Sequence, residues 1–509
     1  MSDKRSFDQV SLTDSLRLRL LRLVPVFVRR GPASGYNERR RILVVRPDHL
    51  GDVLFTTPAL RLLRSTLPDA RITCLVGPWS RVILERNENV DEIVTFDFPW
   101  FNRRKKANLL EPYGQLKRLA DALRSGSFDV AINLRFDFWW GALATYLAGI
   151  PSRIGYDVDA CRPFLTDVCP YESGRHEVER DLRLVELYLR HSATPSEVNA
   201  NLSASRSLNP DQKRGAGACP PLGVQGQTAS IKGTVFGSGE TPGAIHCAPT
   251  DTTGTTNTTT DITMPGVGAR FIAPDPCPPL NARGLGGSGS FFQQPGPARR
   301  ASPSTLDYMP AEDDERIAAA LLSKNGVGEG ETIVALHPGS GAAVKLWTAE
   351  GFARVGNELA RMYGCRIIVT GSAAERGLAS EIARLILDAG NACVPLVLAG
   401  ETSLGQLATV FKRCRLVIGV DSGAMHLAVA AGAPTIHLFG PSDHVAFGPY
   451  GDAKMHRVVR ATMPCSPCGR LDSTCGKTGV SDCMAAITPQ QVIAQAMGML
   501  ATRGGDARA

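Results

Sequence analysis

Short apolar runs rich in β-branched residues alternate with helical patterns in two separate parts of the chain. The first part holds such runs at residues 41–46, 72–76 and 128–134, and the second part holds them at residues 332–337 and 416–420. Apolar strands joined through helices are typical of βαβ units, which build a parallel sheet covered on both faces. The sequence therefore predicts an α/β protein made of two similar halves joined by a linker.

A region of different composition separates the two halves. Residues 203–304 are rich in Gly, Pro, Thr, Ser and Asn and lack hydrophobic periodicity. Such a segment buries too little apolar surface to offset the entropy lost on ordering it. We therefore expect a basic extension at 1–40, a first domain at 41–202, a disordered insertion at 203–304 and a second domain at 305–509.

Composition limits the partners that the chain can have. The formal net charge is +7, and aromatic residues make up 6% of the 509 residues. This mild positive charge suits phosphates, nucleotides or acidic lipid head groups, but it is too weak to indicate nucleic acid. No apolar run reaches the ~20 residues that span a bilayer, and no stretch resembles a cleavable signal peptide. We therefore expect a cytoplasmic protein.

The N-terminal extension combines leucines and arginines. Between residues 16 and 30 the two residue types alternate closely. An amphipathic helix of this kind can lie on an anionic membrane face, which would make the protein peripheral at the inner face of the cytoplasmic membrane. A helix packed on the protein, or a loose extension, would show the same pattern.

The stretch at residues 417–428 (VIGVDSGAMHLA) changes from a strand pattern to a helical pattern within the turn Asp421-Ser422-Gly423. A helix N-terminus carries free N–H groups and the positive end of the helix dipole, so it attracts anions. In open α/β sheets, ligands bind outside the carboxyl ends of the strands, where this turn lies. The same pattern would also arise from an ordinary turn capped by Ser or Asp.

A second glycine-rich turn follows the strand at residues 332–337. It contains Ser340, and Lys345 comes shortly after it. Glycine allows backbone N–H groups to approach an anion closely, while Ser adds a hydroxyl and Lys adds a positive charge. The spacing differs from that of an ATPase phosphate loop. Together the two turns suit a diphosphate, although two glycine-rich turns without a ligand remain the alternative.

In the first half, Gly51 and Asp52 begin a helix after the first strand. A carboxylate at this position could act as a general base that faces the second half. It could equally be a helix cap that interacts with the dipole. The residues alone leave both interpretations open.

These segments together resemble the signatures of glycosyltransferase family 9, the ADP-heptose:lipopolysaccharide heptosyltransferases. The family's N-terminal signature is similar to residues 46–54 (RPDHLGDVL) and 57–60 (TPAL). Its C-terminal motifs are similar to residues 337–340 (HPGS), 345–347 (KLW), 421–426 (DSGAMH) and 439–443 (FGPSD). The resemblance covers about residues 41–200 and 310–498, in the family's order. The insertion at 203–304 is not part of the family pattern.

The resemblance implies a GT-B architecture, in which two Rossmann-like domains face each other across a cleft. It also implies inverting transfer without a metal or other cofactor, from an ADP-heptose-like donor to a lipid-anchored oligosaccharide of the lipopolysaccharide core type. Asp52 would be the catalytic base. The donor would be bound by Ser340, Lys345, Asp421, Ser422, Gly423 and His426. For His426, a place in the core as an ordinary buried histidine is the alternative.

Four cysteines near the C-terminus form a separate group. They are Cys465, Cys468, Cys475 and Cys483, and the first two form a Cys-x-x-Cys pair. Four thiolates can bind zinc tetrahedrally, but the second pair is widely spaced, so a reduced or redox-labile loop is the alternative. Cys74, Cys365, Cys393 and Cys414 lie in apolar or helical stretches and are expected to be reduced core residues.

Three other functions are compatible with the sequence. One is a family 9 transferase with another donor or acceptor. Another is a nucleotide-sugar epimerase, which also uses two Rossmann-like halves. The third is a non-catalytic protein that binds nucleotide sugars.

Overall fold

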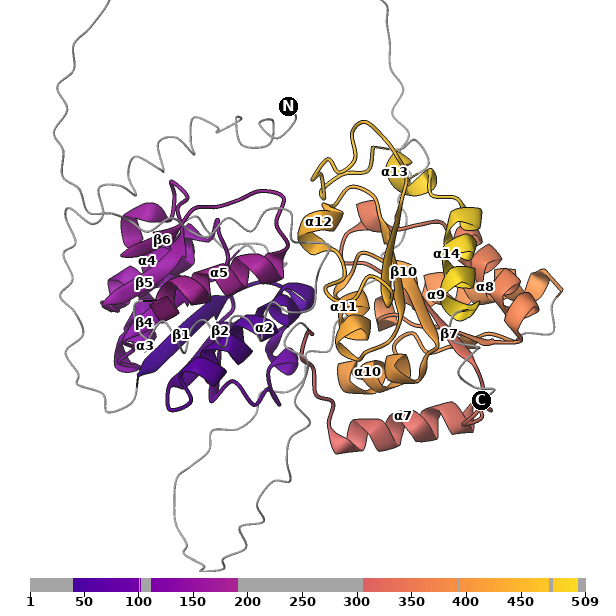
Figure 1. Ribbon diagram of the computed structural model, residues 1–509, viewed down its shortest axis with the longest axis horizontal. Helices are drawn as coiled ribbons and strands as arrows, with labels where there is room; N and C mark the ends of the chain where they lie inside the picture. Colours follow the sequence, from indigo (N-terminus) through magenta and orange to yellow (C-terminus); the bar gives the residue numbers. More distant parts are fainter. Residues whose placement is uncertain are drawn as a thin grey trace, which may run out of the picture. The chain divides into compact units, whose positions relative to one another are not determined.

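The structure is a computed structural model that describes residues 40–99, 101, 111–190, 305–390, 394–475 and 479–501 (Figure 1). These residues belong to one compact unit. The expected amphipathic helix near residue 16 and the expected disordered insertion at 203–304 lie outside the described residues. Both therefore stay predictions, as do the domain boundaries.

The first half is built on a six-stranded sheet in the order β3-β2-β1-β4-β5-β6, with every pair of neighbours parallel. Its strands are β1 (Arg41–Arg46), β2 (Arg71–Val76), β3 (Glu92–Thr95), β4 (Val130–Asn133), β5 (Ser152–Tyr156) and β6 (Asp167–Cys169). In the register, Ile42 of the central strand pairs with Ile72 on one side and Val130 on the other. Helices cover both faces of this sheet, which explains why residues 42–45 in the middle of the central strand are apolar and buried.

The helices of the first half are α2 (Leu50–Thr66), α3 (Glu111–Ser125), α4 (Trp139–Ala148) and α5 (Glu177–Arg190), with short 3-10 turns at Arg81–Ile83 and Arg162–Phe164. Helix α2 packs against α5, and α3 packs against α4. Helix α2 begins at Leu50, directly after His49. Asp52 therefore lies in its first turn, where a helix leaves N–H groups without intrahelical partners.

The second half repeats the topology. Its strands are β7 (Ile333–His337), β8 (Arg366–Val369), β9 (Leu396–Val397), β10 (Leu416–Val420), β11 (Thr435–Phe439) and β12 (His456–Arg460). The order β12-β11-β10-β7-β8-β9 is the first sheet's order when the strands are numbered along the chain. The apolar run at residues 435–440 is the last strand that the sequence predicts, and this prediction is wrong because β12 follows at the sheet edge. Strand β12 contains the charged residues Arg457 and Arg460, so it does not form an apolar run.

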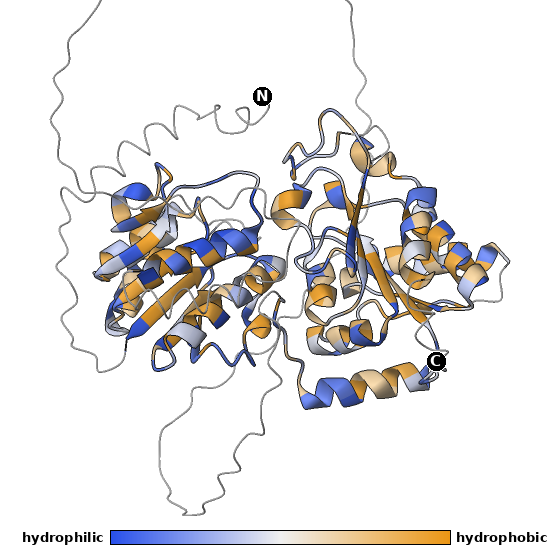
Figure 2. Cartoon of the chain, viewed as in Figure 1, coloured by the Kyte–Doolittle hydropathy of each residue, from blue (hydrophilic) through white to orange (hydrophobic). Residues whose placement is uncertain are grey.

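The helices of the second half are α7 (Glu312–Lys324), α8 (Ala349–Tyr363), α9 (Arg376–Asp388), α10 (Leu404–Arg413), α11 (Gly423–Ala430), α12 (His444–Phe447), α13 (Asp482–Ala485) and α14 (Pro489–Ala501), with 3-10 turns at Ala343–Lys345 and Ala373–Glu375. Thr348 precedes the helical pattern at residues 351–363, which predicts that it is an N-cap. This prediction is confirmed, because the Thr348 hydroxyl accepts a hydrogen bond from Gly351 N at 3.0 Å. Figure 2 shows that the strands are mostly hydrophobic and that most helices carry both hydrophobic and hydrophilic residues.

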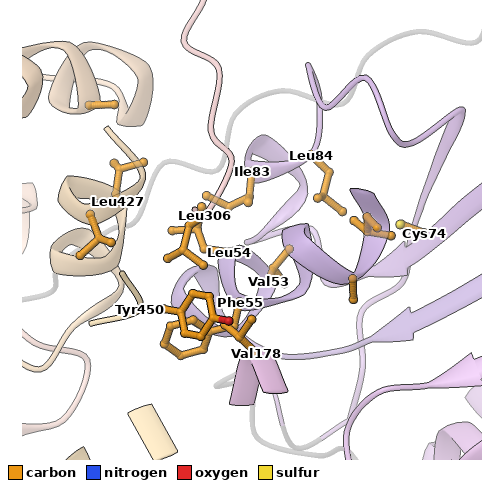
Figure 3. Packing of buried hydrophobic residues seen from close by; sticks show 14 of the residues in the cluster. Val53, Leu54, Phe55, Cys74, Ile83, Leu84, Val178, Leu306, Leu427 and Tyr450 are labelled. Atoms are coloured by element: carbon orange, nitrogen blue, oxygen red, sulfur yellow. The ribbon is translucent and has the colours of Figure 1, made fainter. Parts of the chain in front are cut away.

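The hydrophobic core is continuous between the first and second halves near α2. Leu54 and Phe55 of α2 belong to the same buried cluster as Leu306, Leu427 and Tyr450 (Figure 3). Burial of this apolar surface favours the contact between the two halves at roughly 25 cal/mol per Å². The N-terminus of α2 is therefore held against α11.

The aromatic and basic composition of residues 98–110 predicts an exposed loop, and this prediction is wrong at the first residue. The side chain of Phe98 is fully buried. Its ring lies 5.5 Å from that of Phe138 and 6.2 Å from that of Trp140. Edge-on aromatic packing of this kind makes a side chain part of the core, and such long-range contacts leave no trace in the local sequence.

The predicted core cysteines Cys74, Cys365 and Cys414 are buried, whereas Cys393 lies outside the described residues. In the described part of the chain, no helix has both the length and the apolar character that crossing a membrane requires.

Candidate active site

In each half, the strand order reverses direction at the centre of the sheet. The reversal lies between β1 and β4 in the first half and between β7 and β10 in the second half. Crevices that bind ligands form outside the carboxyl ends of strands at such points. The turns containing Asp52, Ser340 and Asp421 all follow one of these four strands.

The two predicted anion-binding turns of the second half are joined through Asp421. Lys345 Nζ lies 2.7 Å from Asp421 Oδ2, and Ser340 Oγ donates to the backbone oxygen of Asp421 at 3.1 Å. Ser442, which follows β11, donates to Asp421 Oδ2 at 2.6 Å. The side chain of Lys345 is 19% exposed and that of Asp421 is 6% exposed, so the lysine is the member of this group that faces outward.

The charge of Asp421 is well stabilised. Burial alone would raise the pKa of this carboxyl group, but His426 and Lys345 hold the pKa well below its usual range. Asp421 is therefore anionic, and its side chain binds Lys345 rather than capping helix α11. Ser422 is the N-cap residue of α11, yet its side chain makes no capping hydrogen bond. The alternative of a simple capped turn at this position is thus not supported.

His426 has features of both interpretations that the sequence allows. Its side chain is buried, with 4% exposed, and its ring packs edge-on against Phe55 at 4.5 Å. Its Nε2 also lies 3.8 Å from Asp421 Oδ1. Its Nδ1 has no hydrogen-bond partner in the described part of the chain. The ring is thus a core residue whose Nε2 points toward the predicted donor site.

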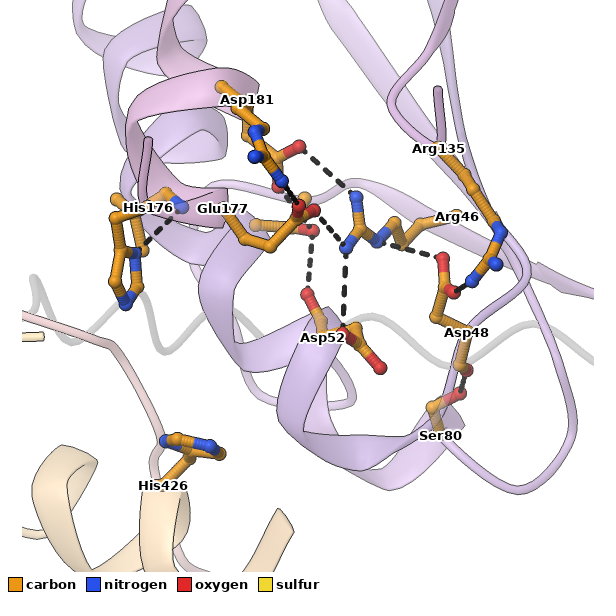
Figure 4. A network of polar contacts seen from close by, with 12 residues as sticks. Arg46, Asp48, Asp52, Ser80, Arg135, His176, Glu177, Asp181 and His426 are labelled. Carbon is orange, nitrogen blue, oxygen red and sulfur yellow. Dashed lines mark hydrogen bonds and ion pairs between the residues drawn. The ribbon is translucent and has the colours of Figure 1, made fainter. Parts of the chain in front are cut away.

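Asp52 is the most exposed carboxylate around Arg46. The Asp52 side chain is 29% exposed, and its Oδ1 lies 3.8 Å from Arg46 Nη2 (Figure 4). Burial, together with the negative charge of Asp48, raises the pKa of Asp52 to about 7, although Arg46 acts in the opposite direction. In the described structure its carboxylate has no hydrogen bond to a helix N–H. This geometry favours the interpretation as a base over that as a cap.

Arg46, the last residue of β1, is surrounded by carboxylates. Its Nε lies 2.9 Å from Asp48, its Nη1 lies 3.2 Å from Asp181 and its Nη2 lies 3.1 Å from Glu177. Two further arginines complete the network, because Arg135 pairs with Asp48 and Arg180 pairs with Glu177. We refer to Arg46, Asp48, Asp52, Arg135, Glu177, Arg180 and Asp181 as the arginine-46 network.

The N-termini of α2 and α11 meet at two glycines. A Cβ atom at Gly51 would lie 3.3 Å from Gly423 Cα and 3.0 Å from His426 Cδ2. Only a residue without a side chain permits this approach without displacing its neighbours. The contact places Asp52 one residue away from the turn that carries Asp421.

Two polar contacts hold the halves together beside this point. His176 Nε2 lies 2.9 Å from the backbone oxygen of Gly448. Because His176 Nδ1 accepts a hydrogen bond from Val178 N at 3.1 Å, the proton of the neutral ring lies on Nε2, which donates to Gly448. Tyr450 also donates its hydroxyl to Glu179 at 2.8 Å.

Comparison with known proteins shows the family to which the chain belongs. The family model described as glycosyltransferase family 9 (heptosyltransferase) matches residues 303–478. Lipopolysaccharide heptosyltransferase 3 of Escherichia coli is 30% identical over 410 residues, which cover 79% of this chain and 84% of that protein. The chain belongs to glycosyltransferase family 9.

Other family 9 relatives match over shorter stretches. Lipooligosaccharide heptosyltransferase 2 of Campylobacter jejuni is 31% identical over 185 residues, which are 35% of this chain. Lipopolysaccharide heptosyltransferase 1 of Pseudomonas aeruginosa is 33% identical over 143 residues, which are 26% of this chain. This chain spans 53% of the length of the C. jejuni protein and 37% of the length of the P. aeruginosa protein.

Solved structures support the predicted GT-B fold of this family 9 chain. A family 9 glycosyl transferase from Veillonella parvula superposes with a TM-score of 0.58 at 20% identity, covering 92% of this chain and 99% of that one. The E. coli ADP-heptose lipopolysaccharide heptosyltransferase II superposes with a TM-score of 0.54 at 19% identity, covering 91% and 99%. The two parallel sheets with their helices therefore form a GT-B fold.

Sequence reasoning missed several members of the site. Ser442 lies within the motif at residues 439–443, but its bond to Asp421 was not foreseen. Asp48 lies in the N-terminal motif. Glu177 and Asp181 have only one local signal, which is that acidic residues four positions apart lie on the same face of a helix.

The C-terminal cysteines do not form a recognisable metal site in the described residues. Cys465, Cys468 and Cys475 are exposed, whereas Cys483 is buried. Among the described residues, no group of three or more His, Cys, Asp or Glu side chains is arranged to hold a metal ion. The zinc hypothesis for these cysteines therefore gains no support and stays a prediction.

Proposed function

We propose that this chain transfers a heptose, or a related sugar, from an ADP-sugar to an acceptor of the lipopolysaccharide core type. Membership of family 9 and the likeness to lipopolysaccharide heptosyltransferase 3 support this choice. A structure titled E. coli heptosyltransferase WaaC with ADP shares the fold with a TM-score of 0.50 at 18% identity, and the superposition covers 90% of this chain and 99% of that one. An ADP-sugar is accordingly the donor that we assign here.

The contact between Gly51 and Gly423 is the observation that carries the proposal. It brings a carboxylate whose pKa is about 7 beside a turn in which a partly exposed lysine is held by an anionic aspartate. A base with a pKa near neutral pH can accept a proton from an acceptor hydroxyl. A cation near a helix N-terminus can hold a phosphate group.

The reaction follows from these roles. Asp52 takes the proton of the acceptor hydroxyl as its oxygen attacks the anomeric carbon of the donor sugar. The bond from that carbon to the diphosphate oxygen breaks, and the nucleoside diphosphate leaves with the electron pair. Attack from the face opposite the leaving group inverts the anomeric configuration. Lys345 and the N-terminus of α11 stabilise the negative charge that develops on the leaving group, the role that a metal ion fills in other transferases.

The test is a product analysis with a panel of nucleotide sugars and core-type acceptors, followed by mass spectrometry. We expect a product heavier by one heptose or related sugar, formed only when acceptor and donor are both present. An isomerised sugar formed without acceptor would indicate an epimerase instead. Binding of the nucleotide sugar without any turnover would indicate a non-catalytic binding protein.

We also propose that residues 1–40, which lie almost wholly outside the described range, attach the enzyme weakly to anionic membranes. Sedimentation with vesicles that contain anionic lipid should decrease as salt increases and after deletion of residues 1–39, because each basic residue near the surface contributes about 1 kcal/mol. Vesicles of neutral lipid are the control. Binding that is independent of lipid charge and salt would contradict this electrostatic attachment.

A further inference from the structure

Asp181 of α5 is a buried carboxyl group for which the proposed reaction has no direct use. Its side chain is 0% exposed, and it contacts two side chains from other elements. Asp181 Oδ1 lies 3.2 Å from Arg46 Nη1, and Asp181 Oδ2 lies 3.1 Å from Thr56 Oγ1. These contacts join α5 to β1 and to α2.

The hydroxyl of Thr56 contacts a second oxygen atom. Thr56 Oγ1 also lies 3.2 Å from the backbone oxygen of Asp52, one helical turn earlier in α2. A hydroxyl group has one proton to donate, and a backbone carbonyl can only accept. If Asp181 is ionised, the single Thr56 proton is shared between Asp181 Oδ2 and the backbone oxygen of Asp52. If Asp181 carries a proton on Oδ2, it donates to Thr56 and leaves the Thr56 proton wholly to Asp52, so that each contact is a separate hydrogen bond.

The balance of charge in the arginine-46 network favours the same proton. Its carboxylates are Asp48, Asp52, Glu177 and Asp181, and its cations are Arg46, Arg135 and Arg180. Arg135 also pairs with Asp137, which is partly exposed. The carboxylates therefore outnumber the arginines, and a proton on one of the buried carboxylates reduces this excess of negative charge. The site that carries this proton decides whether Asp52 is ionised.

Burial decides between the two candidates for this proton. Desolvation disfavours the charged form of a carboxyl group, and it does so most strongly where no water reaches it. Asp181 is 0% exposed, whereas Asp52 is 29% exposed. We propose that Asp181 is held as a neutral carboxylic acid and that it thereby keeps Asp52 ionised as a base.

The titration behaviour of both groups supports this assignment. Burial raises the pKa of Asp181 to about 8 even though Arg46 acts against it, and the pKa of Asp52 is about 7. Other charged and titratable groups around Asp52 and Asp181 come from three elements and two loops. They are Arg46 of β1, Asp48 in the loop after β1, Arg135 in the loop after β4, Tyr156 of β5, and Glu177 and Arg180 of α5. Two interacting carboxyl groups titrate as a pair.

Asp181 is in this view a positioning residue, because it acts on the reaction through Thr56 and Arg46. Its proton allows Thr56 to hold the backbone of the turn that carries Asp52. Its neutrality leaves the charge of Arg46 free to favour the ionised form of Asp52. Only the consequence for turnover rests on the proposed function. The protonation of Asp181 can be measured on the folded protein without any substrate.

The direct test is infrared spectroscopy of the full chain near neutral pH. We expect a carbonyl band of protonated carboxyl groups that shifts in D₂O and that loses its larger part in Asp181→Asn, because only the partly protonated Asp52 then contributes. The matched control is Glu177→Gln, which changes a neighbouring carboxylate on the same helix that also contacts Arg46. Arginine neighbours hold the pKa of Glu177 below its usual value, so this variant should keep the band.

The same two variants should change stability in opposite directions. Asp181 keeps its proton in the folded state up to about pH 8 but loses it near pH ~3.9 in the unfolded state, so wild-type stability falls as pH rises between these values. Asp181→Asn mimics the neutral acid and escapes this loss. Its melting temperature should therefore exceed that of the wild type by a margin that grows from pH 4 to pH 8. Glu177→Gln should instead melt below the wild type, and its deficit should vanish at low pH.

The pH dependence of turnover completes the test. Asp181→Asn should leave the acidic limb of the pH–turnover profile where it lies in the wild type, because no charge is removed. Glu177→Gln removes a negative charge near Asp52 and should shift that limb to lower pH. The proposal is contradicted if Asp181→Asn leaves the infrared band of the protonated carboxyl group unchanged. It is also contradicted if Asp181→Asn melts at a lower temperature than the wild type, or if it shifts the acidic limb of the pH–turnover profile as Glu177→Gln does. Failure of Asp181→Asn to fold would also contradict the proposal. Absence of any transferase activity in the wild type would instead refute the proposed function alone.

Discussion

Asp52→Asn is expected to lower turnover by roughly 10²–10⁴-fold, the range that a general base contributes. The amide keeps the size of the side chain but cannot take a proton from the acceptor hydroxyl. Donor affinity, measured by calorimetry, should change little, because the predicted donor contacts come from Lys345 and Asp421. The melting temperature should not fall, because the amide removes a charge that burial disfavours and because the long contact of 3.8 Å with Arg46 adds little stability.

The pH dependence gives a second measurement of the same assignment. The pKa of Asp52 is raised to about 7, and a base acts only in its ionised form. Turnover of the wild type should therefore fall as pH decreases through about 7. Asp121→Asn is a suitable control, because Asp121 pairs with Lys117 on the surface of α3. This control should leave turnover and the pH profile unchanged, and near-normal turnover in Asp52→Asn would end the assignment of Asp52 as the base.

Lys345→Ala is expected to weaken the donor step in two ways. Turnover should fall by roughly 10²–10³-fold, the cost of removing one group that stabilises charge in a transition state. The dissociation constant of the donor should rise about tenfold or more, since a hydrogen bond to a charged group contributes ~1.5–3 kcal/mol. Asp421→Ala should also impair donor use, because it releases Lys345 and removes the acceptor of the Ser442 hydroxyl.

The control for this prediction must separate donor binding from stability. Lys345→Ala leaves the buried carboxylate of Asp421 without its cation, so the variant should also melt at a lower temperature. Lys345→Arg keeps the charge and should recover part of both losses. Lys412→Ala removes an exposed lysine that pairs with Glu315 on α7 and should change neither quantity. Unchanged donor affinity and turnover in Lys345→Ala and Asp421→Ala would show that the donor site lies elsewhere.

Much of the fold follows from the local sequence. Apolar runs and helical periodicity are properties of neighbouring residues, so they predict both halves, the N-cap at Thr348 and the turns after β7 and β10. Strand β12 was not predicted, and Phe98 was predicted to be exposed although its ring is buried. An edge strand needs no apolar run, and the burial of an aromatic ring depends on distant partners.

The residue types of the candidate site were also present in local motifs. Asp52, Ser340, Lys345 and Asp421 each follow a strand at a sheet position where ligands bind, and that much requires only strand order and turn chemistry. The close approach of Gly51 to Gly423 connects residues from the two halves of the chain. No pattern within either motif encodes that contact.

The arginine-46 network was decided by the tertiary structure alone. Arg46 and Asp181 are 135 positions apart in the chain, and their contact exists because α5 packs against α2. Local sequence specifies which side chains carry charge. Burial and the arrangement of neighbours specify their charge states, because desolvation and Coulomb interactions act between atoms that only folding brings together. The sequence by itself thus determined two Rossmann-like halves and their turns, while the fold decided which carboxyl group near Asp52 holds a proton.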